Sequence, residues 1–182
     1  MPAPADGHHE QLKLALVAAV AQIVGPSGNY HLGPTRAFST HAYKKVHFSQ
    51  EEQPLWHSVR AGLLLLERET GCDDENIAEF FVLAAARYQP GETEKEWLIE
   101  AADVPYTKLQ NRLLDDLQHA IENGPERAGN PLHANIFATD GRPIADRLLI
   151  TDVNRDFMAI GWCCLELRLE VTYHTPARMG TQ

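Results

Sequence analysis

The sequence predicts an α+β fold in which a mostly antiparallel sheet carries two main helices and one extended arm. Two segments repeat apolar residues at three- and four-residue steps, which is typical of helices that bury one face. A third segment, Leu165 to Tyr173, alternates apolar with polar residues, as a half-buried strand does. With 182 residues, 44% of them hydrophobic, the chain is expected to form a single domain over residues 1–182, with an ordered core over about residues 9–175.

The first helix is expected from Gln11 to Val24. Its apolar positions are Leu12, Leu16, Val20 and Ile23. The pair Gly25-Pro26 ends the pattern, and the Gly- and Pro-rich residues up to Gly33 indicate a loop.

The region from His31 to Gln53 has no clear period, and we expect it to form an extended arm or loop. The run Ser49-Gln50-Glu51-Glu52 has the spacing of a capping box and would start a further helix. Pro54, at an early helical position, does not forbid that helix.

Two apolar segments remain ambiguous between strand and helix. Leu55 to Glu69 contains a continuous apolar run, and Ile77 to Gln89 alternates but is rich in alanine. The acidic lead-in Asp73-Asp74-Glu75 is interpreted as a helix start or a solvated turn, because it lacks the spacing of a calcium loop.

The second helix is expected around a four-residue apolar series that Asn123-Gly124-Pro125 ends. The series is Leu109, Leu113, Leu117 and Ile121. Strands are expected to follow: Leu132 to Ala138, the turn Asp140-Gly141, a strand holding Leu148 and Ile150, and a last strand that Pro176 ends.

The net charge of −9 argues against binding to duplex DNA or to an anionic membrane, because both partners attract basic surfaces. We expect no membrane span and no signal peptide, since Met1 to Gly7 lacks a basic region. The three cysteines predict a reducing compartment. Cys163 and Cys164 would point to opposite faces of a strand, and Cys72 stands alone.

We find no motif for catalysis, for a cofactor or for a metal. The nine histidines include no His-Glu-x-x-His pair, and His41 and His47 share no clean face. The glycines Gly25, Gly28 and Gly33 lack the Lys-Ser/Thr ending of a phosphate loop.

Nucleophile motifs are equally absent. Ser39 and Ser58 have no Gly-x-Ser-x-Gly setting, and a pair of Cys72 with His57 is expected by chance alone. Trp56, Trp97 and Trp162 are expected to anchor a core or an interface. An enzyme or ligand-binding domain stays open as an alternative, and it would require a deep pocket holding several of His41, His47, His57 and Glu69.

The order of these elements resembles the tail terminator (tail-completion) proteins of long-tailed bacteriophages. The resemblance covers about residues 10–175. It is carried by the alanine-rich helix from Leu12 to Val24, the arm, the helix around Leu109 to Ile121, and the final alternating run Cys164-Leu165-Glu166-Leu167-Arg168-Leu169-Glu170-Val171-Thr172-Tyr173. It implies that Ala61 to Glu69 and Phe80 to Tyr88 are strands.

The resemblance further implies a virion subunit that is not an enzyme and uses no cofactor. Six copies would form a ring, assembled in the host cytoplasm, that caps the tail tube and joins it to the neck or head-completion protein. The genome would pass through its lumen without specific binding, which suits an acidic chain. The arm from His31 to Gln53 would then contact a neighbouring subunit or the tube. A neck or head–tail adaptor subunit is the nearest alternative.

Overall fold

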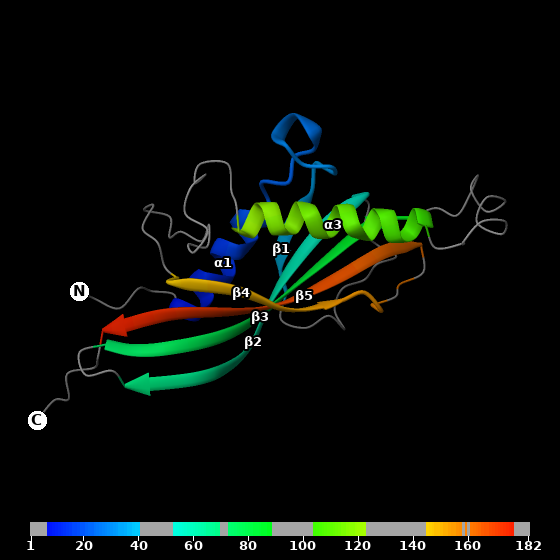
Figure 1. The fold of residues 1–182 in the computed structure, drawn as a ribbon. Coiled ribbons are helices and arrows are strands. Elements are labelled where there is room, and N and C mark those ends of the chain that lie inside the picture. The colour runs from blue at the N-terminus through cyan, green and yellow to red at the C-terminus, as the bar shows by residue number, and fades with distance from the viewer. Residues whose placement is uncertain are drawn as a thin grey trace, which may run out of the picture.

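The computed structural model describes residues 7–40, 53–69, 73–88, 104–122, 145–157, 159 and 161–176. Within them, five strands form one sheet in the order β1-β2-β3-β5-β4 (Figure 1). The strands are β1 (Arg36–Ser39), β2 (Leu55–Glu69), β3 (Asp73–Arg87), β4 (Arg147–Asn154) and β5 (Trp162–Pro176). Strand β1 runs parallel to β2, and the other pairs are antiparallel. The predicted α+β fold is confirmed.

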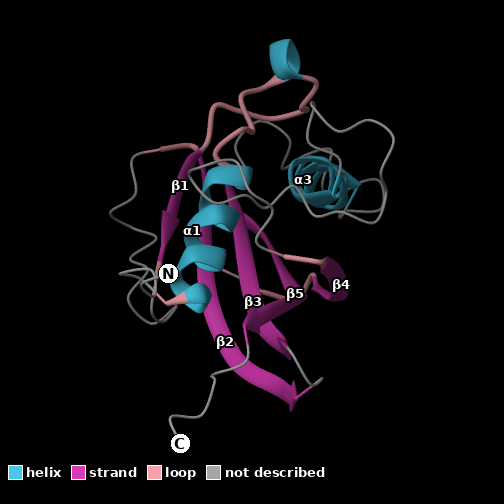
Figure 2. Ribbon diagram, turned by 90° about the vertical axis from the view of Figure 1, so that its left-hand side faces the viewer, coloured by secondary structure: helices cyan, strands magenta, loops and turns pink. Residues whose placement is uncertain are grey.

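Both described α-helices cover the same face of the sheet (Figure 2). Helix α1 (His8–Val20) lies over β1 and β2, and α3 (Val104–Glu122) lies over β3 and β5. The loop after α1 contains a short 3-10 turn, η1 (Pro26–Gly28), and projects past the helices. A single apolar layer between the helices and the sheet therefore forms the main core.

Both predicted helices are confirmed, although α1 is displaced toward the N-terminus. It ends at Val20 because the N–H groups of Gln22 and Ile23 bond to the carbonyls three residues back, which tightens the chain into a turn. Ile23 lies after the end of the helix but is fully buried in that turn. It therefore fits the apolar pattern without being helical.

The two ambiguous segments form the longest hairpin of the sheet. Strand β2 pairs with β3 from Leu55 opposite Ala86 to Glu69 opposite Asp74. The strands implied by the resemblance are therefore present, with Tyr88 directly after the end of β3. Both faces of β3 carry buried apolar residues, since Val82 and Leu83 belong to different core clusters, and this obscures the two-residue period of the strand.

Two local predictions were wrong. The acidic run at Asp73 is neither a helix start nor a solvated turn, because it begins β3 and pairs with both neighbouring strands. No helix follows the predicted capping box into β2, since Leu55 is already paired in the sheet. Strand pairing over a long stretch outweighs a local capping signal. The residues at 49–52, 132–138 and 140–141 lie outside the described ranges.

Alternation in the last strand is confirmed residue by residue. The side chains expected to point inward on β5 are all buried: Leu165, Leu167, Leu169, Val171 and Tyr173. The intervening residues from Glu166 to Thr172 are half-buried on the other face. Each fully buried leucine contributes about 2 kcal/mol of hydrophobic stabilisation relative to an exposed one.

Candidate assembly interface

The root of the predicted arm is part of the folded domain. Within the expected range of 31–53, residues 36–39 form the edge strand β1, which pairs with Trp56 to Val59 of β2. The N–H of Thr40 donates to the carbonyl of Val59 at 3.0 Å and prolongs this pairing. The predicted extended arm or loop therefore contains, near its beginning, a strand that is paired in the sheet. Residues 41–52 lie outside the described ranges.

Residues 31 and 32 are held by a carboxylate on α3. The two oxygens of Asp116 accept the backbone N–H groups of His31 at 2.7 Å and Leu32 at 2.8 Å. Asp116 is 2% exposed, and burial raises the pKa of its carboxyl against the opposing effect of these two donors. Sequence reasoning missed this residue, although an acid between Leu113 and Leu117 in an apolar series was a usable signal.

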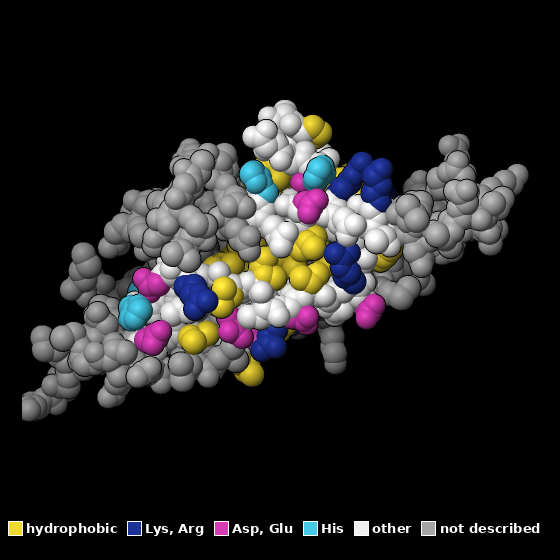
Figure 3. Space-filling model, viewed as in Figure 1, with side chains coloured by type: hydrophobic (Ala, Val, Ile, Leu, Met, Phe, Trp, Pro, Cys, Tyr) yellow, Lys and Arg dark blue, Asp and Glu magenta, His cyan; other side chains and the backbone are white. Residues whose placement is uncertain are grey.

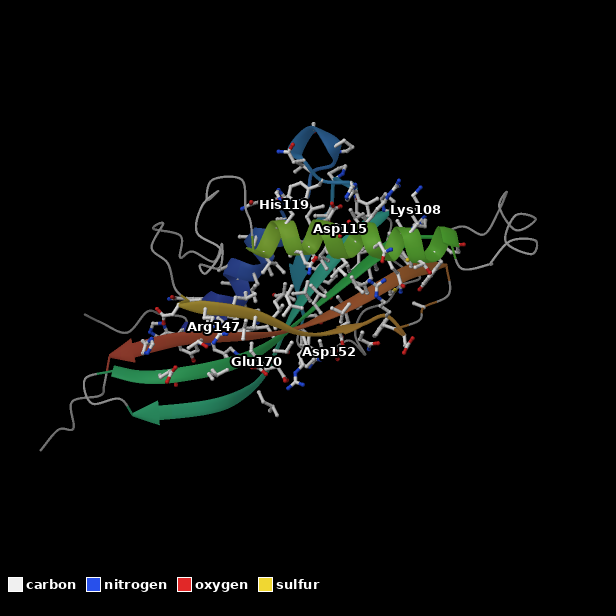
Figure 4. The ribbon with its side chains drawn as sticks, viewed as in Figure 1. Lys108, Asp115, His119, Arg147, Asp152 and Glu170 are labelled. Atoms are coloured by element: carbon white, nitrogen blue, oxygen red, sulfur yellow. The ribbon has the colours of Figure 1, made fainter. Side chains whose placement is uncertain are left out.

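An apolar band lies on the surface between α3 and the edge strand β4 (Figure 3). Its half-buried members, which pack against the main core, are Leu109, Leu114, Leu148, Ile150 and Val153. Lys108, Asp115 and His119 lie on α3 (Figure 4), whereas Arg147 and Asp152 on β4 are cross-strand neighbours of Thr172 and Arg168, which belong to the opposite face of the sheet. An apolar centre with charged side chains around it is the usual composition of a protein–protein contact surface.

Both edges of the described sheet are interrupted by bulges. The register of β2 shifts between Ala61 and Leu64 and again between Leu64 and Leu66, beyond the part of β2 that β1 covers. The register of β4 shifts between Ile150 and Asp152. Bulges twist an edge away from a straight ladder, so these edges are poorly suited to open-ended strand addition.

The face of the sheet opposite the helices carries a row of charged and aromatic side chains across adjacent strands. Arg60, Phe81, Arg168 and Asp152 are consecutive cross-strand neighbours. The guanidinium of Arg60 lies 4.0 Å from the ring centroid of Phe81. Two nitrogens of Arg168 each lie 2.6 Å from one carboxylate oxygen of Glu79, whose side chain is 10% exposed. In this row Arg168 and Glu79 form a charge-assisted pair, and the guanidinium of Arg60 lies over the ring of Phe81.

An aromatic cluster occupies one end of the same face. The rings of Trp56 and Trp162 meet edge-on with centroids 5.9 Å apart, and Phe38 lies 5.6 Å from Trp56. Both tryptophans are buried, and Leu83, Ala85 and Cys164 complete the cluster. The prediction that they anchor a core is confirmed for Trp56 and Trp162. Trp97 lies outside the described residues.

His57, one of the three histidines named for a possible pocket, is buried inside the main core. His57 is fully buried, and its Nδ1 lies 2.6 Å from the Thr35 hydroxyl oxygen. Burial lowers the pKa of His57 to about 3, so its imidazole is neutral at pH 7. Ser58 is fully buried as well. Neither side chain is accessible to a substrate.

The structure separates two of the four residues named for an enzyme pocket, His57 and Glu69. Glu69 lies at the far end of β2, roughly 35–40 Å along the strand from His57 at about 3.3 Å per residue. One pocket cannot hold both. His41, His47 and Cys72 lie outside the described residues, so their pairing with His57 has no structural description.

The two adjacent cysteines point to opposite faces, as predicted. Cys163 belongs to the main core and Cys164 to the aromatic cluster. Burial raises the pKa of both thiols to about 12, so neither supplies a thiolate near pH 7. In the described part of the chain, no three His, Cys, Asp or Glu side chains gather closely enough to hold a metal ion.

The described helices include none that is long and apolar enough to cross a membrane. No protein-family model and no curated protein sequence matches the chain.

Proposed function

We propose that the chain is a structural subunit of a closed ring, and that this ring is the tail terminator of a long-tailed bacteriophage. In this proposal six copies cap the tail tube in the virion and join it to the neck or head-completion protein. The subunit is not an enzyme and uses no cofactor. The genome passes through the lumen without specific binding.

The apolar band between α3 and β4 is the observation that carries the proposal. Its half-buried leucine, isoleucine and valine side chains are surrounded by charged residues, as in a contact surface between subunits. The bulge in β4 next to Asp152 disfavours an added strand at that edge. Contacts through side chains on unlike surfaces of successive copies produce a closed ring when the rotation closes.

The acidic composition supports the same assignment. A net charge of −9 per subunit gives six copies a strongly negative ring, which repels DNA phosphates during passage. Among the described residues, the buried position of His57 and its distance from Glu69 along β2 do not support the enzyme alternative.

The first test is the mass of the purified chain in solution, measured by native mass spectrometry and light scattering over a range of concentrations. A hexamer has a mass of about 122 kDa, six times the 20.3 kDa of one chain. We expect this species either for the chain alone or after tail tubes of the encoding phage are added. A monomer or dimer under both conditions would refute the ring. A ring that binds the isolated neck but not the tube would identify the adaptor alternative.

A sharper test removes the arm while keeping its root. Because β1 runs parallel to β2, the chain must return from Thr40 to Gln53, about 23 Å by the strand register. Replacing residues 41–52 with eight Gly/Ser residues, which span up to about 28 Å, preserves the pairing of β1. We expect a folded monomer that forms no ring.

The matched control for that variant is a twelve-residue Gly/Ser replacement of the same segment, which keeps its length and removes only its side chains. Loss of the ring in both variants assigns the contact to side chains of the arm. Normal ring formation by both variants would show that the arm is not an assembly element.

A further inference from the structure

The loop that leads from α1 to the arm is held in one conformation by its own backbone. Gly25, Asn29 and Gly33 all have positive φ angles, at 98°, 66° and 143°. A Cβ atom on Gly33 would lie 2.4 Å from the backbone nitrogen of Gly25, so the two ends of the loop touch. The N–H of Thr35 also donates to the carbonyl of Ile23 at 3.1 Å. The loop is closed on itself before it reaches β1.

This closed loop is attached to α3 through the buried carboxylate of Asp116. Asp116 receives both consecutive N–H groups of His31 and Leu32, one on each carboxylate oxygen. Tyr30 is 4% exposed, and its ring meets that of His119 edge-on at 5.2 Å. The ring of His31 lies 3.6 Å from Asp115, but both of those side chains are more than half exposed. Asp116 is therefore the buried polar part of the attachment.

Burying a carboxylate at this position lowers the stability of the fold unless its oxygens accept hydrogen bonds. Asp116 lies on the buried side of α3, next to the fully buried Leu117. An apolar residue would pack there without desolvating a charge, but it would leave two backbone N–H groups without an acceptor. What the carboxylate adds to the fold is thus the fixed position of residues 31 and 32 relative to α3.

We propose that Asp116 is a latch that fixes residues 31 and 32, at the start of the predicted arm, against α3, and that ring assembly requires this latch. The inference rests on the proposed function, because it assigns a positioning residue to the assembly of the ring. Residues 31 and 32 are held to α3, and residues 36–39 are held to β2. With both attachments the described chain up to Thr40 is held to α3 and to the sheet. Without the latch the loop keeps its closure at Gly33 and Thr35, but residues 31 and 32 lose their attachment to α3.

The test compares Asp116→Ala with Asp115→Ala as the matched control. Both variants remove one negative charge from the same turn of α3, but the Asp115 side chain is 61% exposed and accepts no backbone bond from the loop in the described structure. Hydrogen–deuterium exchange of the full chain should show at least tenfold faster exchange at His31 and Leu32 in the Asp116→Ala variant. Exchange in β5 should not change. The Asp115→Ala variant should exchange like the wild type at all of these sites.

Asp116→Asn serves as a second variant because it retains one acceptor oxygen and nearly the same shape. We expect it to stay folded even if the alanine variant does not, and to exchange at His31 or Leu32 at an intermediate rate. Unchanged exchange at both amides in Asp116→Asn and Asp116→Ala would overturn the latch.

Native mass spectrometry of the same proteins then tests the role in assembly. We expect at least a tenfold smaller fraction of ring for Asp116→Ala and a normal fraction for Asp115→Ala. Faster exchange together with normal ring formation would show that ring assembly does not require the latch. If the wild type itself forms no ring, the proposed function fails, while the exchange rates still decide whether Asp116 is a latch.

Discussion

The two faces of the sheet use the same strands and bury them in different ways. On the face toward the helices, β3 and β5 present almost only aliphatic and phenylalanine side chains, all at or near zero exposure. On the opposite face, the same strands present buried aromatic residues at one end and a charged row farther along. The adjacent residues Cys163 and Cys164 show the contrast, since each contributes to a different core cluster.

This difference separates residues that hold the fold together from residues that are available for contacts. The helix-covered face excludes water and tolerates no unpaired charge. In the charged row around Phe81, Arg168 is paired with Glu79 and remains partly exposed. A charge should therefore have a large effect on one face and a small effect on the other, and the following predictions test this in order of decreasing effect.

The largest effect is expected for a charge on the covered face. Leu167→Asp places an unpaired carboxylate where the wild-type side chain is fully buried, and we expect a loss of about 4 kcal/mol or more, enough to unfold the domain. Thr172→Asp is the control, because it introduces the same charge at a half-buried position on the other face of β5. Circular dichroism and urea unfolding measure both. A folded Leu167→Asp protein would show that the inward face is assigned incorrectly.

The next effect is the pH dependence contributed by His57. Because burial lowers its pKa from 6.5 to about 3, the unfolded chain binds a proton below about pH 6.5 that the folded chain does not bind until about pH 3. Stability therefore falls as the pH drops through this window, by about 1.4 kcal/mol per pH unit and about 3 kcal/mol at pH 4.

Urea unfolding of the wild type and of His57→Leu at pH 7, 5.5 and 4 measures this dependence. The variant should be less stable at pH 7, because the Thr35 hydroxyl loses its partner, yet its stability should change less with pH. Equal slopes for wild type and His57→Leu would contradict the burial argument.

The covered face was largely predictable from the sequence because it follows single-period patterns. The final strand alternates cleanly, and the series through Leu113 and Leu117 repeats every four residues. Strand β3 was not predictable from its pattern. It is buried on both faces, with Val82 in the main core and Leu83 in the aromatic cluster, so the period of two is lost.

The candidate interface was less predictable because its parts are distant in sequence. Trp56 and Trp162 meet only because β2, β3 and β5 are neighbours in the sheet. Strand β1 is four residues long, too short to show a period, so it was interpreted as part of an irregular arm. Asp116 has its partners 84 and 85 residues away, and no local pattern encodes that separation.

A smaller effect is expected for the ion pair of Arg168 and Glu79, on the face opposite the helices. The loss of stability should differ according to which partner is removed. Arg168→Ala leaves the Glu79 carboxylate, 10% exposed, without its cation, and should cost about 2 kcal/mol. Glu79→Ala leaves a guanidinium that is 42% exposed and can turn to water, so it should cost about 1 kcal/mol. Urea unfolding of the single and double variants gives the coupling energy. Equal costs for the two single variants would show that the face is more open to water than the structure indicates.

The smallest effect is expected for adding a side chain at Gly62, on the face of the sheet opposite the helices. A Cβ atom on Gly62 would lie 2.5 Å from a carboxylate oxygen of Glu79 and 2.9 Å from the ring of Phe81. Gly62→Ala should cost about 1 kcal/mol in urea unfolding, because the carboxylate can move aside but the ring, under the guanidinium of Arg60, has less freedom. Combining it with Glu79→Ala should recover part of that cost, since both close contacts with Glu79 are then absent and only the contact with Phe81 remains. If the losses of stability from Gly62→Ala and Glu79→Ala simply add, the strain lies at Phe81 alone. The space available at Gly62 would then be set by the Phe81 ring and not by the ion pair.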